Sequence, residues 1–302
     1  MTISANQYKC HTNHKFGFVI LHYLAYESTI ECVDSILNCL NHTNIYEVVI
    51  VDNGSSNNSG KLIDSKYKDM SNIHVILLKD NLGFAKGNNI GFQYAKKELN
   101  CDFICMLNND TILSQNTFID KCYEIYQHHS YAVIGPMIIR KDDTIQPLIK
   151  TIRSRKFYIL YRYFIRLELF MSYLGFNTAK ITNFIVHILQ IFRRSNQIHE
   201  GADYENSQTN IRLHGCCWIF TPQFVNKFQG INNKTFLYRE EELLYILLCK
   251  NNLESIYTPE LRIHHLEDVS TDMIVNTPKK KREFIYRNEI ASLKILINEM
   301  KA

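Results

Sequence analysis

An apolar run that ends in two amides and a carboxylate is the part of this sequence best suited to chemistry. Residues 101–107 (CDFICML) are mostly apolar, and Asn108, Asn109 and Asp110 follow them directly. A buried strand ending here delivers Asp110 to the carboxyl edge of a sheet, where open α/β folds bind ligands. A carboxylate at this edge can hold Mg²⁺ or Mn²⁺, and that cation can hold a diphosphate. The alternative is an ordinary strand-to-turn junction, which Asn and Asp favour.

A second carboxylate, Asp52, closes another apolar run, residues 46–52 (YEVVIVD). A carboxylate at the end of a buried strand can accept the N3–H of a uracil or thymine ring. Tyr23, at the end of the earlier run 16–22, could cover the face of the same ring. The structural alternatives are a turn-forming aspartate and a tyrosine at the edge of the core.

Glycine recurs every four residues in the segment 81–91 (NLGFAKGNNIG). The segment is neither a P-loop nor a GxGxxG fingerprint. On a helix this spacing puts Gly83, Gly87 and Gly91 on one face, where a second backbone or a ligand can approach closely. Tight packing of a helix on a sheet would explain the same glycines without any ligand.

The elements that must position these residues alternate between strand and helix. We expect strands at 16–22, 46–52, 73–78, 102–107 and 131–135, and helices at 28–40 and 83–98. Ser28 and Glu31 have the spacing of a capping box, which predicts the start of the first helix. This alternation predicts an α/β fold with a mostly parallel, doubly wound sheet flanked by helices.

Bulk composition excludes several classes of protein. The 302 residues are 46% hydrophobic, which suits one large globular unit or two closely packed ones, and the net charge of +4 does not indicate a nucleic-acid partner. Nine cysteines without a CxxC pair indicate reduced, intracellular thiols rather than a disulfide framework or a zinc site. The first 15 residues have no apolar core, and no apolar run reaches about 18 residues, so we expect neither a signal peptide nor a membrane-spanning helix.

Four segments, in their order and spacing, resemble family 2 glycosyltransferases, most closely the bacterial rhamnosyltransferase-like branch that builds surface polysaccharides. They are FVILHYLAYESTIECVDSIL, VVIVDNGSSNNS, NLGFAKGNNIGFQYA and FICMLNND. The resemblance implies a GT-A fold in which Asp52 contacts the nucleotide base. It also implies that Asp110 is the remaining acid of a DxD-like motif for Mg²⁺ or Mn²⁺, with an amide, Asn108, in place of the first acid. The donor-binding residues it implies are Tyr23, Asp52, Asn53, Asn81, Gly83, Gly87, Asn88, Asn108 and Asn109.

An acidic triplet, Glu240-Glu241-Glu242, opens a predicted helix at 240–249. The helix dipole alone would favour acids in a first turn. The triplet also resembles the family's Glu-Asp motif, which implies that Glu241 is the catalytic base for the acceptor hydroxyl. By the same resemblance Gly215, Cys216 and Glu240 would contact the acceptor.

A histidine pair precedes the segment LEDVST, which resembles the family's His-x-Glu-Asp-x-Ser motif. The match falls on His265, whose imidazole could ligate the metal or contact the diphosphate. A histidine that caps the end of a strand at 260–264 is the structural alternative.

Basic, amphipathic helices are predicted in the middle of the chain and at its end. Leu160, Phe164, Leu167, Met171 and Leu174 share a helical face among many arginines, and a second short helix is expected at 181–192. The basic run 279–282 precedes a helix whose apolar face comprises Tyr286, Ile290, Leu293, Ile297 and Met300. Such helices can bind an anionic membrane surface. For the middle helices the alternatives are packing on the core or a homodimer contact, and for the basic run 279–282 the alternative is a solvated face.

The sequence thus predicts an inverting glycosyltransferase of the cytoplasm, peripheral at the inner face of the plasma membrane. It would move a sugar from dTDP-rhamnose or a UDP-sugar to a hydroxyl of a glycan or lipid-linked acceptor in surface polysaccharide synthesis. We expect a nucleotide-sugar half at 1–115, an acceptor half at 116–271 with a helical insertion at 150–200, and a helical tail at 272–302. One alternative is a non-catalytic, membrane-associated assembly partner. A sugar-1-phosphate nucleotidyltransferase would need a basic, Gly-rich loop after the first strand, where this chain has HYLAY.

Overall fold

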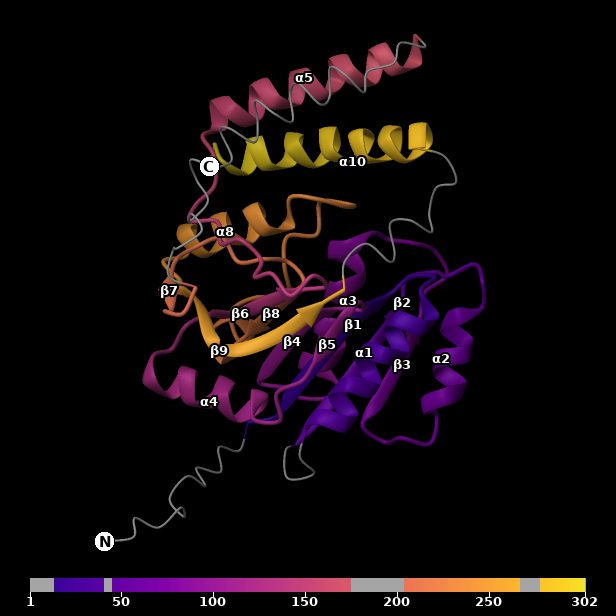
Figure 1. Ribbon diagram of the computed structural model, residues 1–302, viewed down its shortest axis with the longest axis vertical. Helices are drawn as coiled ribbons and strands as arrows, with labels where there is room; N and C mark the ends of the chain where they lie inside the picture. Colours follow the sequence, from indigo (N-terminus) through magenta and orange to yellow (C-terminus); the bar gives the residue numbers. More distant parts are fainter. Residues whose placement is uncertain (1–13, 41–44, 175–203, 267–277, 302) are drawn as a thin grey trace, which may run out of the picture.

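Strands and helices alternate along the first part of the chain and build one central sheet (Figure 1). The computed structural model describes residues 14–40, 45–174, 204–266 and 278–301. The strands are β1 (Phe16–His22), β2 (Tyr46–Asp52), β3 (Ile73–Leu77), β4 (Phe103–Asn108), β5 (Thr111–Leu113), β6 (Val133–Arg140), β7 (Gln208–Thr209), β8 (Cys217–Phe220) and β9 (Ser255–His265). The helices are α1 (Tyr26–Cys39), α2 (Ser59–Tyr67), α3 (Phe84–Lys97), α4 (Phe118–His128), α5 (Arg155–Tyr173), α7 (Pro222–Val225), α8 (Glu240–Lys250) and α10 (Pro278–Glu299).

The sheet has a parallel half and a mixed half. Its strand order in the described residues is β3-β2-β1-β4-β8-β6-β9-β5, with β7 paired to β9. The strands β3, β2, β1 and β4 are mutually parallel, whereas β8 runs antiparallel to both of its neighbours. Beyond it β6 and β9 are parallel again. The expected α/β class, with a mostly parallel sheet and flanking helices, is therefore confirmed.

Side-chain alternation along the strands divides the core between the two faces of the sheet. In β1, Phe18 and Ile20 join a cluster with α1, α2 and α4. Val19, on the opposite face, joins a cluster that includes α3, α7 and α8. Because both faces are covered, the central strands are continuously apolar rather than alternating, which is typical of parallel sheets.

The glycines of α3 allow this helix to lie very close to the sheet. A Cβ added to Gly87 would collide with Leu21, and one added to Gly91 would collide with Val19. Gly83, just before the helix, has φ of 85°, a left-handed conformation that favours glycine. Tight helix–sheet packing, one of the two interpretations of the glycine spacing, thus accounts for Gly87 and Gly91.

The start of α1 differs from the prediction. The helix begins at Tyr26, its N-cap is Ala25, and no side chain caps it. The expected capping box of Ser28 and Glu31 is therefore wrong, because Ser28 already lies inside the helix. Backbone hydrogen bonds explain the earlier start, since the N–H of Thr29 already donates to the Ala25 carbonyl.

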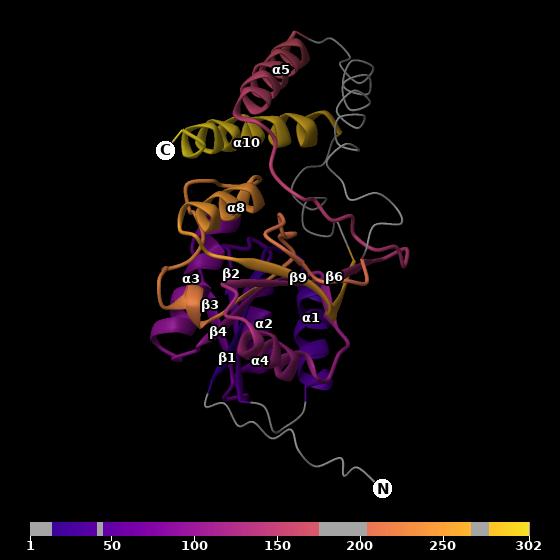
Figure 2. The ribbon, with the colours of Figure 1, turned by 90° about the vertical axis from the view of Figure 1, so that its left-hand side faces the viewer.

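Two long helices form a separate layer over α8 (Figure 2). Helices α5 and α10 run antiparallel, because Arg155 reaches the carbonyl of Ile297 and Ser172 reaches Glu283. The predicted apolar face of the C-terminal helix lies inside this layer, with Leu293 fully buried. This face therefore packs on α5 and α8. The second basic helix expected at 181–192 lies outside the described residues. Within the described parts of the chain, no helix is both long and apolar enough to cross a bilayer.

Candidate active site

The carboxyl ends of β1, β2 and β4 bring the predicted donor-side residues to one edge of the sheet. The strand register pairs His22 with Asp52 and Leu21 with Asn108. Asp52 and Asn109 are both largely buried there. The expectation that these strand ends share an edge is confirmed, because neighbouring parallel strands end together.

The Asp52 side chain, at the end of β2, reaches the first turn of α2. One of its oxygens accepts the N–H of Ser55 at 3.2 Å. A Cβ on Gly60, in the first turn of α2, would collide with the carboxylate, so glycine makes room for it. A helix N-terminus favours a negative charge, which suits a carboxylate at this position.

His22 is a structural brace at this edge. Its two ring nitrogens each lie 2.7 Å from a hydroxyl, one of Thr29 and one of Ser59. Burial lowers the pKa of His22 to about 4, although the nearby Asp52 acts in the opposite direction. The neutral imidazole therefore ties the first turn of α1 to the start of α2. Tyr23 follows it in the chain and is half-buried.

Asn53 and Asn81 shape the loop in front of α3. The Asn53 amide donates to the Asn81 side chain at 2.9 Å, and the N–H of Leu82 donates to Asn53 at 2.9 Å. The N–H of Gly83 donates to Asn81 at 2.9 Å. Asn88, inside α3, donates to the Phe84 carbonyl at 3.1 Å. These amides thus fix the loop, and their contact with a donor stays a prediction.

Asp110 and His265 meet although 155 positions separate them. The pairing of β5 with β9 sets Thr111 opposite His265, and the N–H of Leu266 donates to the Asp110 carbonyl at 2.9 Å. The Asp110 Oδ1 and His265 Nε2 atoms lie 3.2 Å apart. Both atoms are buried and neither makes a hydrogen bond of good geometry. The predicted pair of metal ligands is therefore brought together.

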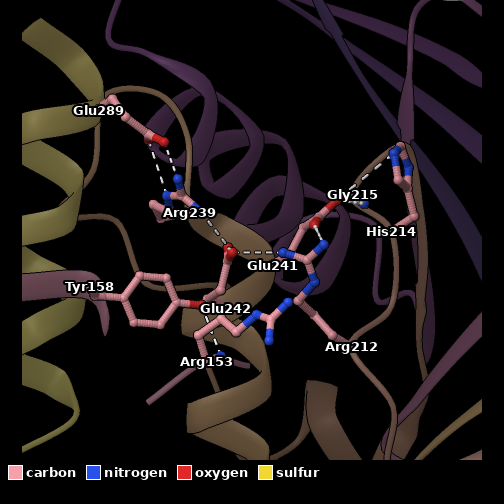
Figure 3. A network of polar contacts seen from close by, with 9 residues as sticks. All are labelled: Arg153, Tyr158, Arg212, His214, Gly215, Arg239, Glu241, Glu242 and Glu289. Atoms are coloured by element: carbon pink, nitrogen blue, oxygen red, sulfur yellow. Dashed lines mark hydrogen bonds and ion pairs between the residues drawn. The ribbon is translucent and has the colours of Figure 1, made fainter. Parts of the chain in front are cut away.

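Glu241 is held at both carboxylate oxygens (Figure 3). The N–H of Gly215 donates to Oε1 at 2.8 Å, and the Arg212 guanidinium lies 3.2 Å from Oε2. The His214 ring lies 4.0 Å from Glu241 and packs edge-on against His265, with ring centroids 5.7 Å apart. Glu241 keeps 22% of its side chain exposed. This carboxylate is therefore fixed in position and still partly open to solvent, and its role as a base stays a prediction.

Behind Glu241 lies a buried network of acids and arginines that joins three helices (Figure 3). Glu242 contacts Arg212 at 2.6 Å and Arg239 at 3.0 Å, and Arg239 also pairs with Glu289 of α10. The Arg239 guanidinium lies over the Tyr158 ring of α5. Burial alone would raise the pKa of Glu242, but the charges of Arg239 and Arg212 hold it below its usual value. The network is therefore charged and paired.

Two predicted acceptor-side residues do not turn toward Glu241. Glu240 is buried and accepts the Thr235 hydroxyl at 2.9 Å. The Cys216 side chain is also buried, and burial raises its pKa well above the usual value. Of the three predicted acceptor-side residues, Gly215 contacts the Glu241 carboxylate, through its backbone N–H. Acceptor binding by these residues stays a prediction.

The Glu240→Gln variant is expected to be more stable than the parent at about pH 8 and not at about pH 5. Burial raises the pKa of Glu240 from 4.5 to about 7. An acid with a raised pKa holds its proton in the folded state after the unfolded chain has lost it. Stability is therefore lost as the pH rises from about 4.5 to about 7, by about 3 kcal/mol in total. Urea unfolding of both proteins at the two pH values measures this difference, and equal gains at both values would contradict it.

Sequence reasoning did not single out Arg212, His214 or Arg239 as site residues. A signal for the first two was present, since a cation and a histidine stand just before Gly215 in the stretch IRLHG. For Arg239 and its partner Glu289 there was none, because their pairing depends on how α10 docks on α8. The acidic triplet alone also does not indicate which of its acids faces outward.

A parallel half-sheet continued by antiparallel β8, with polar residues gathered at the strand carboxyl ends, defines the GT-A class of fold. The chain belongs to glycosyl transferase family 2, whose family model matches residues 18–197. The resemblance seen in the four sequence segments is thereby confirmed.

Curated relatives match in a shorter region. A low-salt glycan biosynthesis hexosyltransferase, Agl10 of Haloferax volcanii, is 32% identical over 98 residues, covering 32% of this chain and 30% of the relative. The dTDP-rhamnosyl transferase RfbF of Shigella flexneri is 28% identical over 119 residues, covering 39% of this chain and 38% of the relative. The chain thus spans about a third of the length of the curated relatives it matches.

Solved structures share the fold at low sequence identity. The crystal structure of S. aureus TarS 1-349 has a TM-score of 0.52 and 12% identity, covering 83% of this chain and 60% of that one. The same protein in complex with UDP gives a TM-score of 0.53 at 12% identity, covering 89% of this chain and 68% of that one. At such identity the likeness establishes the fold only.

Proposed function

We propose that this chain is an inverting glycosyltransferase that moves a sugar from a nucleoside-diphosphate sugar to a hydroxyl of a glycan or lipid-linked acceptor. The observation that carries the proposal is Glu241, a carboxylate fixed by Gly215 and Arg212 and joined through His214 to the pair Asp110 and His265. Base and diphosphate site are thus parts of one constellation. Relatives named as a hexosyltransferase and a dTDP-rhamnosyl transferase support the reaction class.

The donor would lie along the carboxyl edge of the parallel half-sheet. Asp52 would accept the N3–H of a uracil or thymine ring, with Tyr23 over the ring face. The loop shaped by Asn53 and Asn81 would line the pocket. We propose dTDP-rhamnose or a UDP-sugar as the donor, since one relative is a dTDP-rhamnosyl transferase and the TarS neighbour was solved with UDP.

Asp110 and His265 fit a divalent cation. A buried carboxylate oxygen and a buried imidazole nitrogen lie close together without hydrogen bonds. Among the described residues, no group of three or more His, Cys, Asp or Glu side chains could hold a metal. Mg²⁺ or Mn²⁺ often takes one or two protein ligands and completes its shell with phosphate oxygens and water. Bound here, the cation would supply positive charge to the departing diphosphate.

Glu241 would act at the acceptor hydroxyl. As the acceptor oxygen bonds to the anomeric carbon, its proton passes to the Glu241 carboxylate, and the bond from that carbon to the diphosphate oxygen breaks. Attack opposite the leaving group inverts the anomeric centre. Arg212 and the Gly215 N–H hold the carboxylate in place while it changes charge.

The acceptor would enter from the cleft beside Glu241. Glu241, Arg212 and His214 line this cleft together with Gln146 and Tyr257, which come from the segment after β6 and from β9. We assign 1–115 to donor binding and 116–271 to acceptor binding, with 272–302 as a helical tail. The work would take place in the cytoplasm, at the inner face of the membrane.

Release of nucleoside diphosphate by the purified chain tests the proposal. With a panel of dTDP- and UDP-sugars, and with lipid-linked acceptors, we expect release that requires Mg²⁺ or Mn²⁺. The Asp110→Asn variant should lose at least about 10²-fold of this activity, because it removes the only formal charge of the Asn108-Asn109-Asp110 motif. The exposed Asp69 gives the matched control, Asp69→Asn, which should keep full activity.

A non-catalytic assembly partner is the competing function, favoured by the amide at Asn108 in place of an acid. Such a protein would bind a sugar nucleotide, or nothing, without turning it over. Binding of the donor measured by calorimetry, together with release that no acceptor in the panel stimulates, would favour this function. Turnover that survives Asp110→Asn unchanged would refute the assigned metal site.

A further inference from the structure

Helix α5 exposes a continuous stripe of large apolar side chains. We call this the α5 stripe, and its members are Leu160 (71% exposed), Tyr163 (63%), Leu167 (57%), Phe170 (57%) and Leu174 (57%). They follow one another by three or four positions and so share one face of the helix. Apart from Tyr173 beside the stripe, the other exposed large apolar side chains of the described residues all lie outside α5; they are Ile45, Leu62, Met70, Leu77, Leu82 and Phe236.

The stripe is not needed to hold α5 in place. The opposite face of α5 already buries Tyr158 and Ile165 against α10 and α8. Arg155 and Arg162 donate to carbonyls of α10 at 3.1 and 3.0 Å. The helix is therefore apolar on two faces, and the structure uses one of them. A contiguous exposed apolar face of this kind marks an interaction site.

Positive charge surrounds the stripe. Helices α5 and α10 together carry ten basic and four acidic residues, a net +6, whereas the whole chain is +4 and the remainder therefore −2. Lys156 and Arg166 are exposed on α5 itself. Contacts between Ser172 and Glu283 bring the exposed Lys279 and Lys280 of α10 near the end of the stripe. The partner of this face should therefore be both apolar and anionic.

We propose that the α5 stripe and its basic rim lie in the surface of an anionic lipid membrane. The apolar side chains would enter the acyl boundary and the lysines and arginines would meet the phosphate groups. A second copy of this chain fits less well, because a twofold contact through the stripe would bring together two helix pairs that each carry a net charge of +6. The segment 175–203, with three basic and two acidic residues, supplies no anionic partner either.

The position of the α5 stripe relative to Glu241 indicates which kind of acceptor the enzyme would use. Helix α10 lies between α5 and α8, and α8 carries Glu241 at its start (Figures 1 and 2). Arg239 links the layers through Glu289. A membrane on the outer face of α5 would therefore be separated from the proposed base by the layer that α5 and α10 form together. This inference rests on the proposed function and makes it more specific. The acceptor hydroxyl would belong to a molecule anchored in the membrane.

Flotation of the full chain with lipid vesicles tests the surface. We expect binding to vesicles of phosphatidylglycerol and phosphatidylethanolamine, little binding to phosphatidylcholine, and release in about 0.5 M salt. The double variant Leu167→Glu/Phe170→Glu should bind about tenfold or more weakly, with an unchanged unfolding midpoint. Ile45, 70% exposed beside the amino end of β2, gives the control Ile45→Glu, which should bind like the parent.

Several results would overturn the proposal that the α5 stripe binds a membrane. These are failure to bind anionic vesicles, binding that the double variant does not weaken, and a dimer in light scattering that the double variant dissociates. If the parent did not bind vesicles and the double variant had a lower unfolding midpoint, the stripe would be covered by another part of the chain itself. The proposed function is tested separately. Vesicle binding without sugar-nucleotide turnover would contradict the proposed glycosyltransferase activity. Transfer to a soluble acceptor without vesicle binding would contradict the proposed membrane contact of the α5 stripe.

Discussion

Replacement of Glu241 by glutamine is expected to slow sugar transfer by about 10²–10⁴-fold while leaving the affinity for the sugar nucleotide unchanged. Glutamine keeps the shape of the side chain, and its oxygen can still accept the Gly215 N–H. It cannot take the proton of the acceptor hydroxyl. The measurements are kcat from released nucleoside diphosphate and donor affinity from calorimetry.

The control for this variant is Glu260→Gln, at an exposed position of β9. It should leave kcat unchanged. The Glu241→Asp variant separates chemistry from structure, because it keeps the base but withdraws it by one methylene, and should lie between the parent and Glu241→Gln. If the parent, Glu241→Gln and Glu241→Asp all had the same kcat, another group would be the base.

Replacement of Arg239 by methionine is expected to destabilise the fold by about 3–5 kcal/mol. Arg239 is the shared partner of Glu242 and Glu289, and both carboxylates are largely buried. Without the guanidinium, Glu289 loses its partner and Glu242 keeps only Arg212. Removing one member of a buried ion network costs far more than the network itself contributes, because a charge is left buried. Urea unfolding followed by circular dichroism measures the loss.

A second substitution shows whether the unpaired charge of Glu289 causes the loss of stability in Arg239→Met. The double variant Arg239→Met/Glu289→Gln should be more stable than Arg239→Met alone, since one buried charge is gone. Arg262 is exposed on β9, and Arg262→Met should change stability by less than about 0.5 kcal/mol. A loss below about 1 kcal/mol for Arg239→Met would mean that water enters the network and screens it.

The same network bears on the reaction. Arg212 contacts both Glu241 and Glu242, so the position of the proposed base depends on a charge pair that extends to α10. Loosening α10 would let Arg212 shift and Glu241 with it. The stability and the activity of Arg239 variants should therefore decline together.

Local patterns in the sequence were enough to predict the parallel half of the sheet. β1 and β2 have the bounds expected from their apolar, β-branched runs, and α3 begins one residue after Gly83. These patterns succeed because strands buried on both faces need long apolar runs and because glycine marks close approach. The capping box failed because Ser28 and Glu31 have the right spacing, while the backbone of Ala25 already starts the helix.

Other features depend on where distant segments meet. The chain order gives no hint that β8 inserts between β4 and β6, or that β6 continues to Arg140 alongside β9. For α5 the residue spacing predicts an amphipathic helix with Phe164 and Met171 in its apolar face. The structure leaves these two half-buried and exposes Tyr163 and Phe170 instead. Which face of a helix is covered depends on its neighbours.

The sequence by itself determined the α/β class and the residue types at the carboxyl ends of β1, β2 and β4, because these follow from periodicity and spacing along one stretch of chain. It also indicated the family, through the resemblance of four segments to family 2 glycosyltransferases. Only the tertiary structure decided that Asp110 meets His265, that Arg212 holds Glu241, and that Glu240 turns inward. The physical reason is that hydrogen bonds and ion pairs act over a few ångströms in space. The partners that satisfy a buried charge are therefore set by how the sheet and helices pack, whatever their separation in the chain.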